Sequence, residues 1–228
     1  LVGQVEHWMP GGEFAELGQD GQATYAGVEY AYRSHRELTL VRPLRSKAMG
    51  RKYEAITESV ADFIKSQPMF FVGTAPERNG HVNVSPKGAD TLRVVDPNAV
   101  AYLDLAGSAA ETIAHLRDNG RITFMWCSFG PKPRILRVYG DGVHVLPTDP
   151  QFAELAALFP AYKATRSIIK VAVERIADSC GFGVPEMEFV GQRTRMAEWA
   201  ERQSPAELQQ YMRSNNTSSI DGLPAWEG

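Results

Sequence analysis

The sequence has very little cysteine. Only Cys127 and Cys180 occur among its 228 residues. Two cysteines cannot build the disulfide framework that stabilises small secreted domains. We therefore expect both side chains to be buried, reduced thiols of a cytoplasmic protein.

Long apolar runs and an excess of positive charge are also absent. No run approaches the roughly 20 apolar residues of a membrane-spanning helix. The first residues, Leu1-Val2-Gly3-Gln4, lack the basic and then apolar pattern of a secretory signal. The net charge is −3, which offers no general electrostatic attraction for nucleic acid or for an anionic membrane. These features predict a cytoplasmic protein that binds neither.

Several common catalytic motifs are missing as well. The sequence contains no Gly-x-Ser-x-Gly elbow, no phosphate-binding Gly-x-x-x-x-Gly-Lys-Ser/Thr loop and no Gly-x-Gly-x-x-Gly. It has no His-Glu-x-x-His and no Cys-x-x-Cys pair. The five histidines show no metal-ligand spacing; they are His7, His35, His81, His115 and His144. We expect no metal site, and no catalytic residue can be identified from these motifs.

The chain divides near residue 48. Residues 1–48 contain scattered glycines and arginines without a sustained period of 2 or 3.6, whereas regular patterns begin at Met49. The first part is either a poorly ordered extension or an upstream segment foreign to the native protein, whose natural start would then be Met49. Residues 49–228 are long enough for one folded domain.

Four or five helices are expected in this domain. Thr57 is a suitable N-cap for the first, which Pro68 ends. Ser108 and Glu111 have capping-box spacing at the start of a helix over 109–119, and Asn119-Gly120 ends it. Asp149 caps a third, and two short helices follow over 194–203 and 205–214.

About six strands complete the pattern. They are expected at 69–75, 81–85, 99–105, 121–129, 134–146 and 167–179. Gly140-Asp141-Gly142 interrupts the fifth, as bulges at barrel corners do. Because the strands do not alternate regularly with helices, the sequence predicts the α+β class with a largely antiparallel barrel.

Two segments carry a resemblance to a known family. The first runs from Phe70 to Tyr139 and includes Val82-Asn83-Val84-Ser85-Pro86-Lys87-Gly88. The second is the run 180–193, in which Phe182-Gly183-Val184-Pro185 leads to Glu188-Phe189. Their order and spacing resemble the FMN-binding split barrel of the pyridoxamine 5′-phosphate oxidase family, over roughly residues 54–202. FMN is flavin mononucleotide.

The resemblance implies a set of flavin-binding positions. Lys87 matches the strand-end lysine that approaches the flavin, where its ammonium could reach the phosphate or the N1–C2=O edge of the ring. Ser85 could donate a hydrogen bond to the cofactor, or merely satisfy its own turn. The positions implied to bind the cofactor are Lys87, Ser85, Tyr102, Leu103, Ser108, Thr112 and Arg134.

Each of these residues also has a purely structural interpretation. Lys87 could be a solvated turn lysine, and Tyr102 an ordinary core aromatic. Ser108, with Thr112, could form an anion site at a helix start or simply cap that helix. Arginines in strands, such as Arg134, are often exposed. Trp126 and Phe129 fit core packing better than ring shielding, and Arg193 and Arg195 fall near the family's late basic residues.

The chain also departs from the family pattern. The family's strand before the lysine opens with an arginine, and its helix start carries Arg-Lys, whereas this chain has Val82 and Ala109-Ala110. Val190 stands where the family has a late tryptophan, and the C-terminal Arg-Leu-x-Pro ending is absent. Vitamin B6 oxidase activity itself is therefore not implied.

The resemblance implies an FMN-dependent oxidoreductase that acts on a small molecule and forms a homodimer with the flavin between its subunits. Positive charge near N1 would tune the ring. Two alternatives stay open from the sequence. One is a binding module that holds flavin or haem without turnover, and the other is a deazaflavin-dependent reductase.

Overall fold

The computed structural model describes residues 22–25, 28–31 and 50–228. Contacts divide the chain into two units, Leu1–Ser46 and Lys47–Gly228. In the first unit, β1 (Gln22–Tyr25) and β2 (Val28–Ala31) form an antiparallel pair. Most of residues 1–48 lie outside the described ranges, so their expected exclusion from the core stays a prediction.

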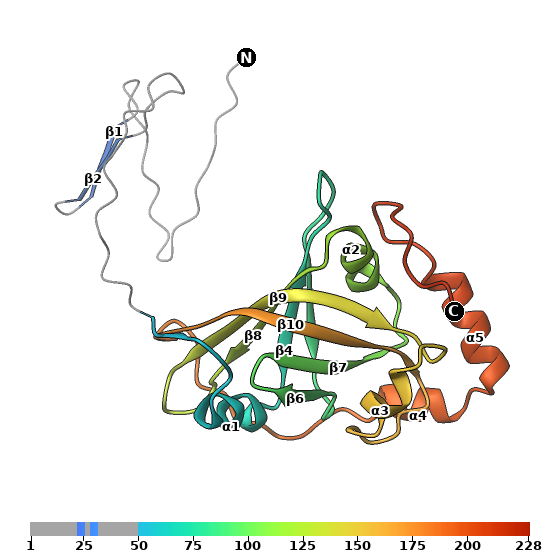
Figure 1. The fold of residues 1–228 in the computed structure, drawn as a ribbon. Coiled ribbons are helices and arrows are strands. Elements are labelled where there is room, and N and C mark those ends of the chain that lie inside the picture. The colour runs from blue at the N-terminus through green and yellow to red at the C-terminus, as the bar shows by residue number, and fades with distance from the viewer. Residues whose placement is uncertain (1–21, 26–27, 32–49) are drawn as a thin grey trace, which may run out of the picture. The chain divides into compact units, whose positions relative to one another are not determined.

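An antiparallel sheet forms the centre of the second unit (Figure 1). Its strands follow the order β5-β4-β8-β9-β10-β7-β6, and β3 pairs separately with β10. The strands are β3 (Lys52–Tyr53), β4 (Phe70–Thr74), β5 (Asn83–Lys87), β6 (Leu92–Asp96), β7 (Ala99–Leu105), β8 (Arg121–Cys127), β9 (Ile135–Val145) and β10 (Thr165–Ser179). The predicted α+β class with an antiparallel, barrel-like sheet is confirmed.

The sheet has eight strands where about six were expected. The six expected strands are all present. The two additional ones are β3, which has only two residues, and β6, whose side chains are half-buried in succession and do not alternate. Both lack the period-2 signal by which a half-buried strand is recognised.

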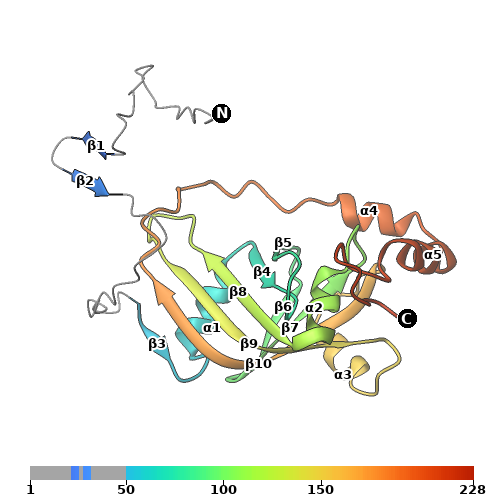
Figure 2. The ribbon, with the colours of Figure 1, turned by 90° about the horizontal axis from the view of Figure 1, so that it is seen from above.

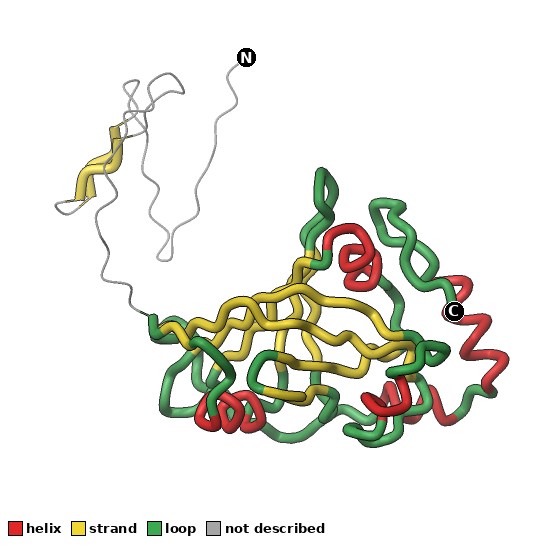
Figure 3. Tube along the Cα trace, viewed as in Figure 1, coloured by secondary structure: helices red, strands yellow, loops and turns green. Residues whose placement is uncertain are grey.

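Helices surround the sheet (Figure 3). They are α1 (Glu58–Ser66), α2 (Glu111–Asn119), α3 (Phe152–Ala156), α4 (Arg195–Glu201) and α5 (Pro205–Asn215). None of the helices in the described ranges is long and apolar enough to cross a membrane. In those same ranges, no three His, Cys, Asp or Glu side chains are grouped to hold a metal ion.

Two of the predicted helix caps are wrong. Helix α2 follows Ala110 without a side-chain cap, because the Glu111 carboxylate instead accepts the backbone N–H of Ile220, at 3.0 Å. Helix α3 begins after Gln151, since Asp149 accepts the backbone N–H of Leu146, at 2.7 Å. The predicted helix end at Gly120 is confirmed by its left-handed φ of 71°.

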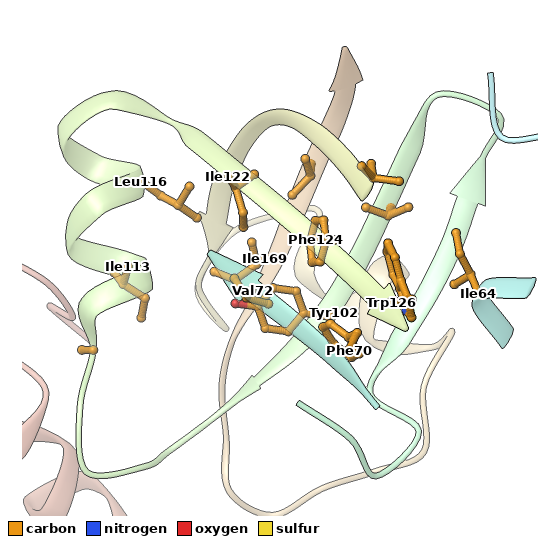
Figure 4. Packing of buried hydrophobic residues seen from close by; sticks show 14 of the residues in the cluster. Ile64, Phe70, Val72, Tyr102, Ile113, Leu116, Ile122, Phe124, Trp126 and Ile169 are labelled. Atoms are coloured by element: carbon orange, nitrogen blue, oxygen red, sulfur yellow. The ribbon is translucent and has the colours of Figure 1, made fainter. Parts of the chain in front are cut away.

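Aromatic side chains fill the interior of the sheet (Figure 4). Phe70, Phe124 and Trp126 lie with ring centroids 5.7 to 6.0 Å apart, and Tyr102 meets Phe124 edge-on at 5.8 Å. Trp126 is buried, which confirms the core interpretation of this residue. Both cysteines are free; Cys127 is buried as predicted, whereas Cys180 is only half-buried.

Strand β10 links the two halves of the sheet, because it pairs with β9 on one side and β7 on the other. Its register against β7 shifts where Thr165 faces Leu105 and Ser167 faces Asp104. Arg166 is therefore the extra residue of a β-bulge, a feature that re-aims a side chain.

Candidate functional site

A cavity of about 840 Å³ lies at the ends of β5 and β7. Its walls come from the β5 end, the β7 end with the loop that follows it, and residues 187–193. Two smaller cavities, of about 450 and 430 Å³, lie beside α1 and over β8 and β9. Only the largest of these three gathers several predicted cofactor-binding residues.

Four of the seven predicted residues line this cavity: Ser85, Lys87, Leu103 and Ser108. They come from β5, from β7 and from the loop before α2. Lys87 and Ser85 are half-buried, Leu103 is buried and Ser108 is exposed. Segments distant in the sequence thus place an ammonium, two hydroxyls and an apolar side chain around one space.

Tyr102 does not line the cavity. Neighbouring residues of a strand face opposite sides of the sheet, so Leu103 faces the cavity and Tyr102 faces the core (Figure 4). Its hydroxyl has no hydrogen-bond partner in the described part of the chain. Burial raises the pKa of Tyr102 well above its usual value. The position of Tyr102 therefore supports its interpretation as an ordinary core aromatic.

Thr112 is connected to the cavity only indirectly. Asn83 donates to the hydroxyls of Thr112 and Thr74, each at 3.3 Å, and accepts a hydrogen bond from Ser85 at 3.1 Å. The Thr74 hydroxyl also lies 2.9 Å from Nδ1 of His115. This chain of polar groups, buried at Thr74, Thr112 and His115, holds the Ser85 hydroxyl in place. No sequence pattern singles out Asn83, which looks like an ordinary strand residue.

Arg134 lies outside the cavity lining. Its guanidinium donates to the Tyr53 hydroxyl at 2.9 Å, lies 3.2 Å from the Asp178 carboxylate and stacks over the Phe63 ring. Burial alone would raise the pKa of Asp178, but Tyr53, the Arg51 N–H and Arg134 together lower it. Arg134 directly precedes β9 and connects this strand to β3 and α1. The structure therefore places it away from the predicted cofactor-binding residues that line the cavity.

The turn after Lys87 has an unusual backbone. Ala89 and Asp90 both have positive φ, at 61° and 55°, which non-glycine residues seldom adopt. The Thr91 hydroxyl holds the turn by donating to the Gly88 carbonyl at 2.7 Å. Gly88, Ala89 and Thr91 line the cavity. Such strained turns cluster at binding sites, and this one positions the end of β5.

An extended segment lines one side of the cavity. Residues 182–194 connect β10 to α4 without a helix or strand (Figure 2). Met187 N–H donates to the Phe129 carbonyl at 2.9 Å, and Gln192 bonds the Pro68 carbonyl and the Ala89 N–H. Of the two late arginines, Arg193 lines the cavity and Arg195 does not.

Arg166, which no sequence pattern singled out, also lines the cavity. Its Nε lies 2.8 Å from the Asp104 carboxylate, and both side chains are buried. One signal was available, because Asp104 and Arg166 are opposite charges in segments that are otherwise largely apolar. Buried charges are rare unless they are paired.

Comparisons with known proteins identify the family. The family model described as pyridoxamine 5′-phosphate oxidase matches residues 56–180. A pyridoxamine 5′-phosphate oxidase family protein of Aspergillus flavus, ustO, is 37% identical over an alignment of 189 residues, and the match covers 75% of this chain and 76% of that protein. The chain therefore belongs to the pyridoxamine 5′-phosphate oxidase family.

Solved structures with some similarity were also found. HupZ of Group A Streptococcus is 22% identical, with a TM-score of 0.43 over 53% of this chain and 91% of that one. An FAD-binding protein of Mesorhizobium loti is 14% identical, with a TM-score of 0.40 over 57% of this chain and 96% of that one. An FMN-binding protein of Syntrophomonas wolfei is 16% identical, with a TM-score of 0.37 over 50% and 78%.

Proposed function

We propose that this chain binds a flavin, specifically FMN, in the cavity at the ends of β5 and β7 and uses it as an oxidoreductase of small molecules. Membership of the pyridoxamine 5′-phosphate oxidase family supports the proposal. The observation that carries it is the convergence of Ser85, Lys87, Leu103 and Ser108 on one cavity.

The donor set of the cavity fits this cofactor. FMN presents a phosphate dianion and a flat, largely apolar ring system. The cavity offers cations and hydroxyls for the phosphate, in Lys87, Arg193, Ser85 and Ser108, and apolar surface for the ring. Its volume lies within the roughly 300 to 1,000 Å³ of typical ligand sites.

Each side of the cavity would have a distinct task. When bound, the flavin supplies hydride transfer at its N5 atom. Lys87 would hold the phosphate or the N1–C2=O edge through a charge-assisted hydrogen bond. Leu103 would pack against the ring, and the extended segment 187–193 would limit the access of water. No side chain of the cavity needs to act as an acid or base in such a reaction.

We further propose a cytoplasmic homodimer in which β5 contributes to the interface. Strand β5 is an edge of the sheet, because its only strand partner in the described residues is β4. Val84 on this strand and Val82 just before it are 63% and 74% exposed. Apolar side chains on an open edge strand invite pairing with another chain. Sedimentation of wild type and of Val84→Asp would test this, because a dimer should dissociate in the variant.

An absorbance spectrum of the purified protein tests the flavin directly. The two bands of oxidised flavin, with FMN released on heating, are the expected result. Bleaching by a reduced nicotinamide would support the oxidoreductase, whereas colour without bleaching would favour a binding module. A colourless protein that also fails to bind added FMN at micromolar concentration would contradict the proposal.

A further inference from the structure

Arg166 occupies a special position in the wall of the cavity. It is the extra residue of the β10 bulge, between Thr165 and Ser167. Because it has no residue opposite it on β7, its side chain is not constrained to the alternation of the strand. The side chain is 3% exposed and still lines the same cavity as Ser108 and Lys87.

Two hydrogen bonds fix the guanidinium in place. Nε donates to Asp104 at 2.8 Å, and Nη1 donates to the carbonyl of Ala109 at 3.0 Å. The Ser167 hydroxyl donates to the same Asp104 oxygen at 3.3 Å. A guanidinium has five N–H donors, and these bonds use two of them. Within the described residues the other three N–H donors make no hydrogen bond, and the guanidinium that carries them is already held in one orientation.

A role in stability alone explains this pair poorly. Replacing a buried ion pair by apolar residues is often neutral or stabilising, because both charges lose their hydration. Here the second oxygen of Asp104 is also buried and has no hydrogen-bond partner in the described ranges. An arginine that is held in the wall of a cavity at this energetic cost is better explained by an anion that it binds there.

Arg166 differs from the other two cations of the cavity. Lys87 is half-buried on a flexible stem, and Arg193 is exposed in a segment without secondary structure. Arg166 is buried, so its charge is less screened by water. Its planar fork matches two phosphate oxygens at once, and its fixed rotamer lowers the entropy lost on binding.

We propose that Arg166 binds the phosphate group of the cavity ligand, and that Asp104 is the positioning residue that holds its guanidinium. This assignment rests on the proposed FMN site. It names the ligand class as a phosphorylated flavin in preference to the dephosphorylated form. The selectivity for the phosphate would come from Arg166, on the wall formed by β7 and β10.

The test compares FMN with riboflavin, which has the same ring and no phosphate. Dissociation constants of both are measured by flavin fluorescence for wild type and for Arg166→Gln. We expect FMN binding to weaken by about tenfold to a hundredfold, as for the loss of charge-assisted hydrogen bonds. Riboflavin binding should change by less than about threefold. Arg137→Gln, on β9 and outside the cavity lining, is the matched control.

A second variant separates binding from folding. Arg166→Gln leaves a buried Asp104 carboxylate without its cation, so the single variant can unfold. The double variant Asp104→Asn with Arg166→Gln replaces the ion pair by a neutral pair, so its thermal midpoint should recover. Its affinity for FMN should no longer exceed its affinity for riboflavin. Wild-type preference for FMN in this double variant would overturn the assignment, as would equal losses for both flavins.

The result for wild type distinguishes the two proposals. Wild type that binds FMN and riboflavin equally well would keep the flavin site and overturn the role of Arg166. Wild type that binds neither flavin would overturn the proposed function, and the assignment of Arg166 with it.

Discussion

The side chain of Gln192 donates to the backbone carbonyl of Pro68 at 2.7 Å, across 124 positions of the chain. Its carbonyl oxygen also accepts the N–H of Ala89 at 3.2 Å. A single side chain therefore ties the extended segment to the start of β4 and to the turn after β5. These bonds hold one wall of the cavity in place.

Removing this link should accelerate flavin release. Gln192→Ala loses two hydrogen bonds, which contribute roughly 0.5 to 1.5 kcal/mol each. We expect the FMN dissociation rate to rise about tenfold, and the thermal midpoint of the protein without ligand to fall by a few degrees at most. Stopped-flow fluorescence would measure the rate. Gln210→Ala on α5, a glutamine bonded only to exposed Ser214, is the control; equal rates in both variants would contradict the prediction.

Lys87 should contribute directly to affinity. Lys87→Gln removes the cation at the end of β5, and we expect the dissociation constant for FMN to rise about tenfold or more. Because this side chain is only half-buried, the thermal midpoint should change little. Isothermal titration would measure both Lys87→Gln and Lys65→Gln, an exposed lysine of α1. Unchanged affinity in the first variant would mean that Lys87 is a solvated turn residue.

Tyr102 should not contribute to flavin binding. The family resemblance implied that it binds the cofactor, but the structure places it in the core. Tyr102→Phe keeps the ring and removes a buried hydroxyl that has no partner in the described residues. We expect the free energy of unfolding to change by less than about 1 kcal/mol, in the stabilising direction. FMN affinity should stay the same. Weaker FMN binding with an unchanged thermal midpoint would show that the hydroxyl does contact the cofactor.

Local sequence signals predicted much of the barrel. Strand β7 has the predicted bounds, because a short apolar run flanked by turn residues is itself enough to define a buried strand. Helix α2 ends where Asn119-Gly120 predicted, since glycine readily adopts the left-handed conformation that ends a helix. Ser204 and Glu207, which have capping-box spacing in the sequence, also form a capping box in the structure.

Several of the errors arose where distant partners decide the outcome. Glu111 has the spacing of a capping box with Ser108, but it binds the N–H of Ile220, 109 positions away. The bulge at Arg166 exists only relative to β7, and its partner Asp104 is 62 positions away. Single-sequence patterns report short periods and local caps, so they carry no information about such pairs.

Acid should destabilise the protein partly through Asp178. Burial raises the pKa of this carboxyl, but hydrogen bonds from Tyr53 and the Arg51 N–H and the charge of Arg134 outweigh it and lower the pKa in the folded state. A lowered folded-state pKa contributes stability above the unfolded-state value of about 4, and this contribution is lost as the pH falls through the folded-state value. Asp178→Asn should therefore have a lower thermal midpoint than wild type near neutral pH. On acidification, the thermal midpoint of the variant should fall by less than that of wild type.

Thermal midpoints of wild type and Asp178→Asn, measured from neutral pH down to about pH 3, would test this linkage. The two curves should converge as the pH falls, because protonation removes from wild type the interaction that the variant already lacks. Asp62→Asn, at an exposed position of α1, should run parallel to wild type throughout. A constant gap between wild type and Asp178→Asn at every pH would show that the Asp178 contacts with Tyr53 and Arg134 do not depend on its charge.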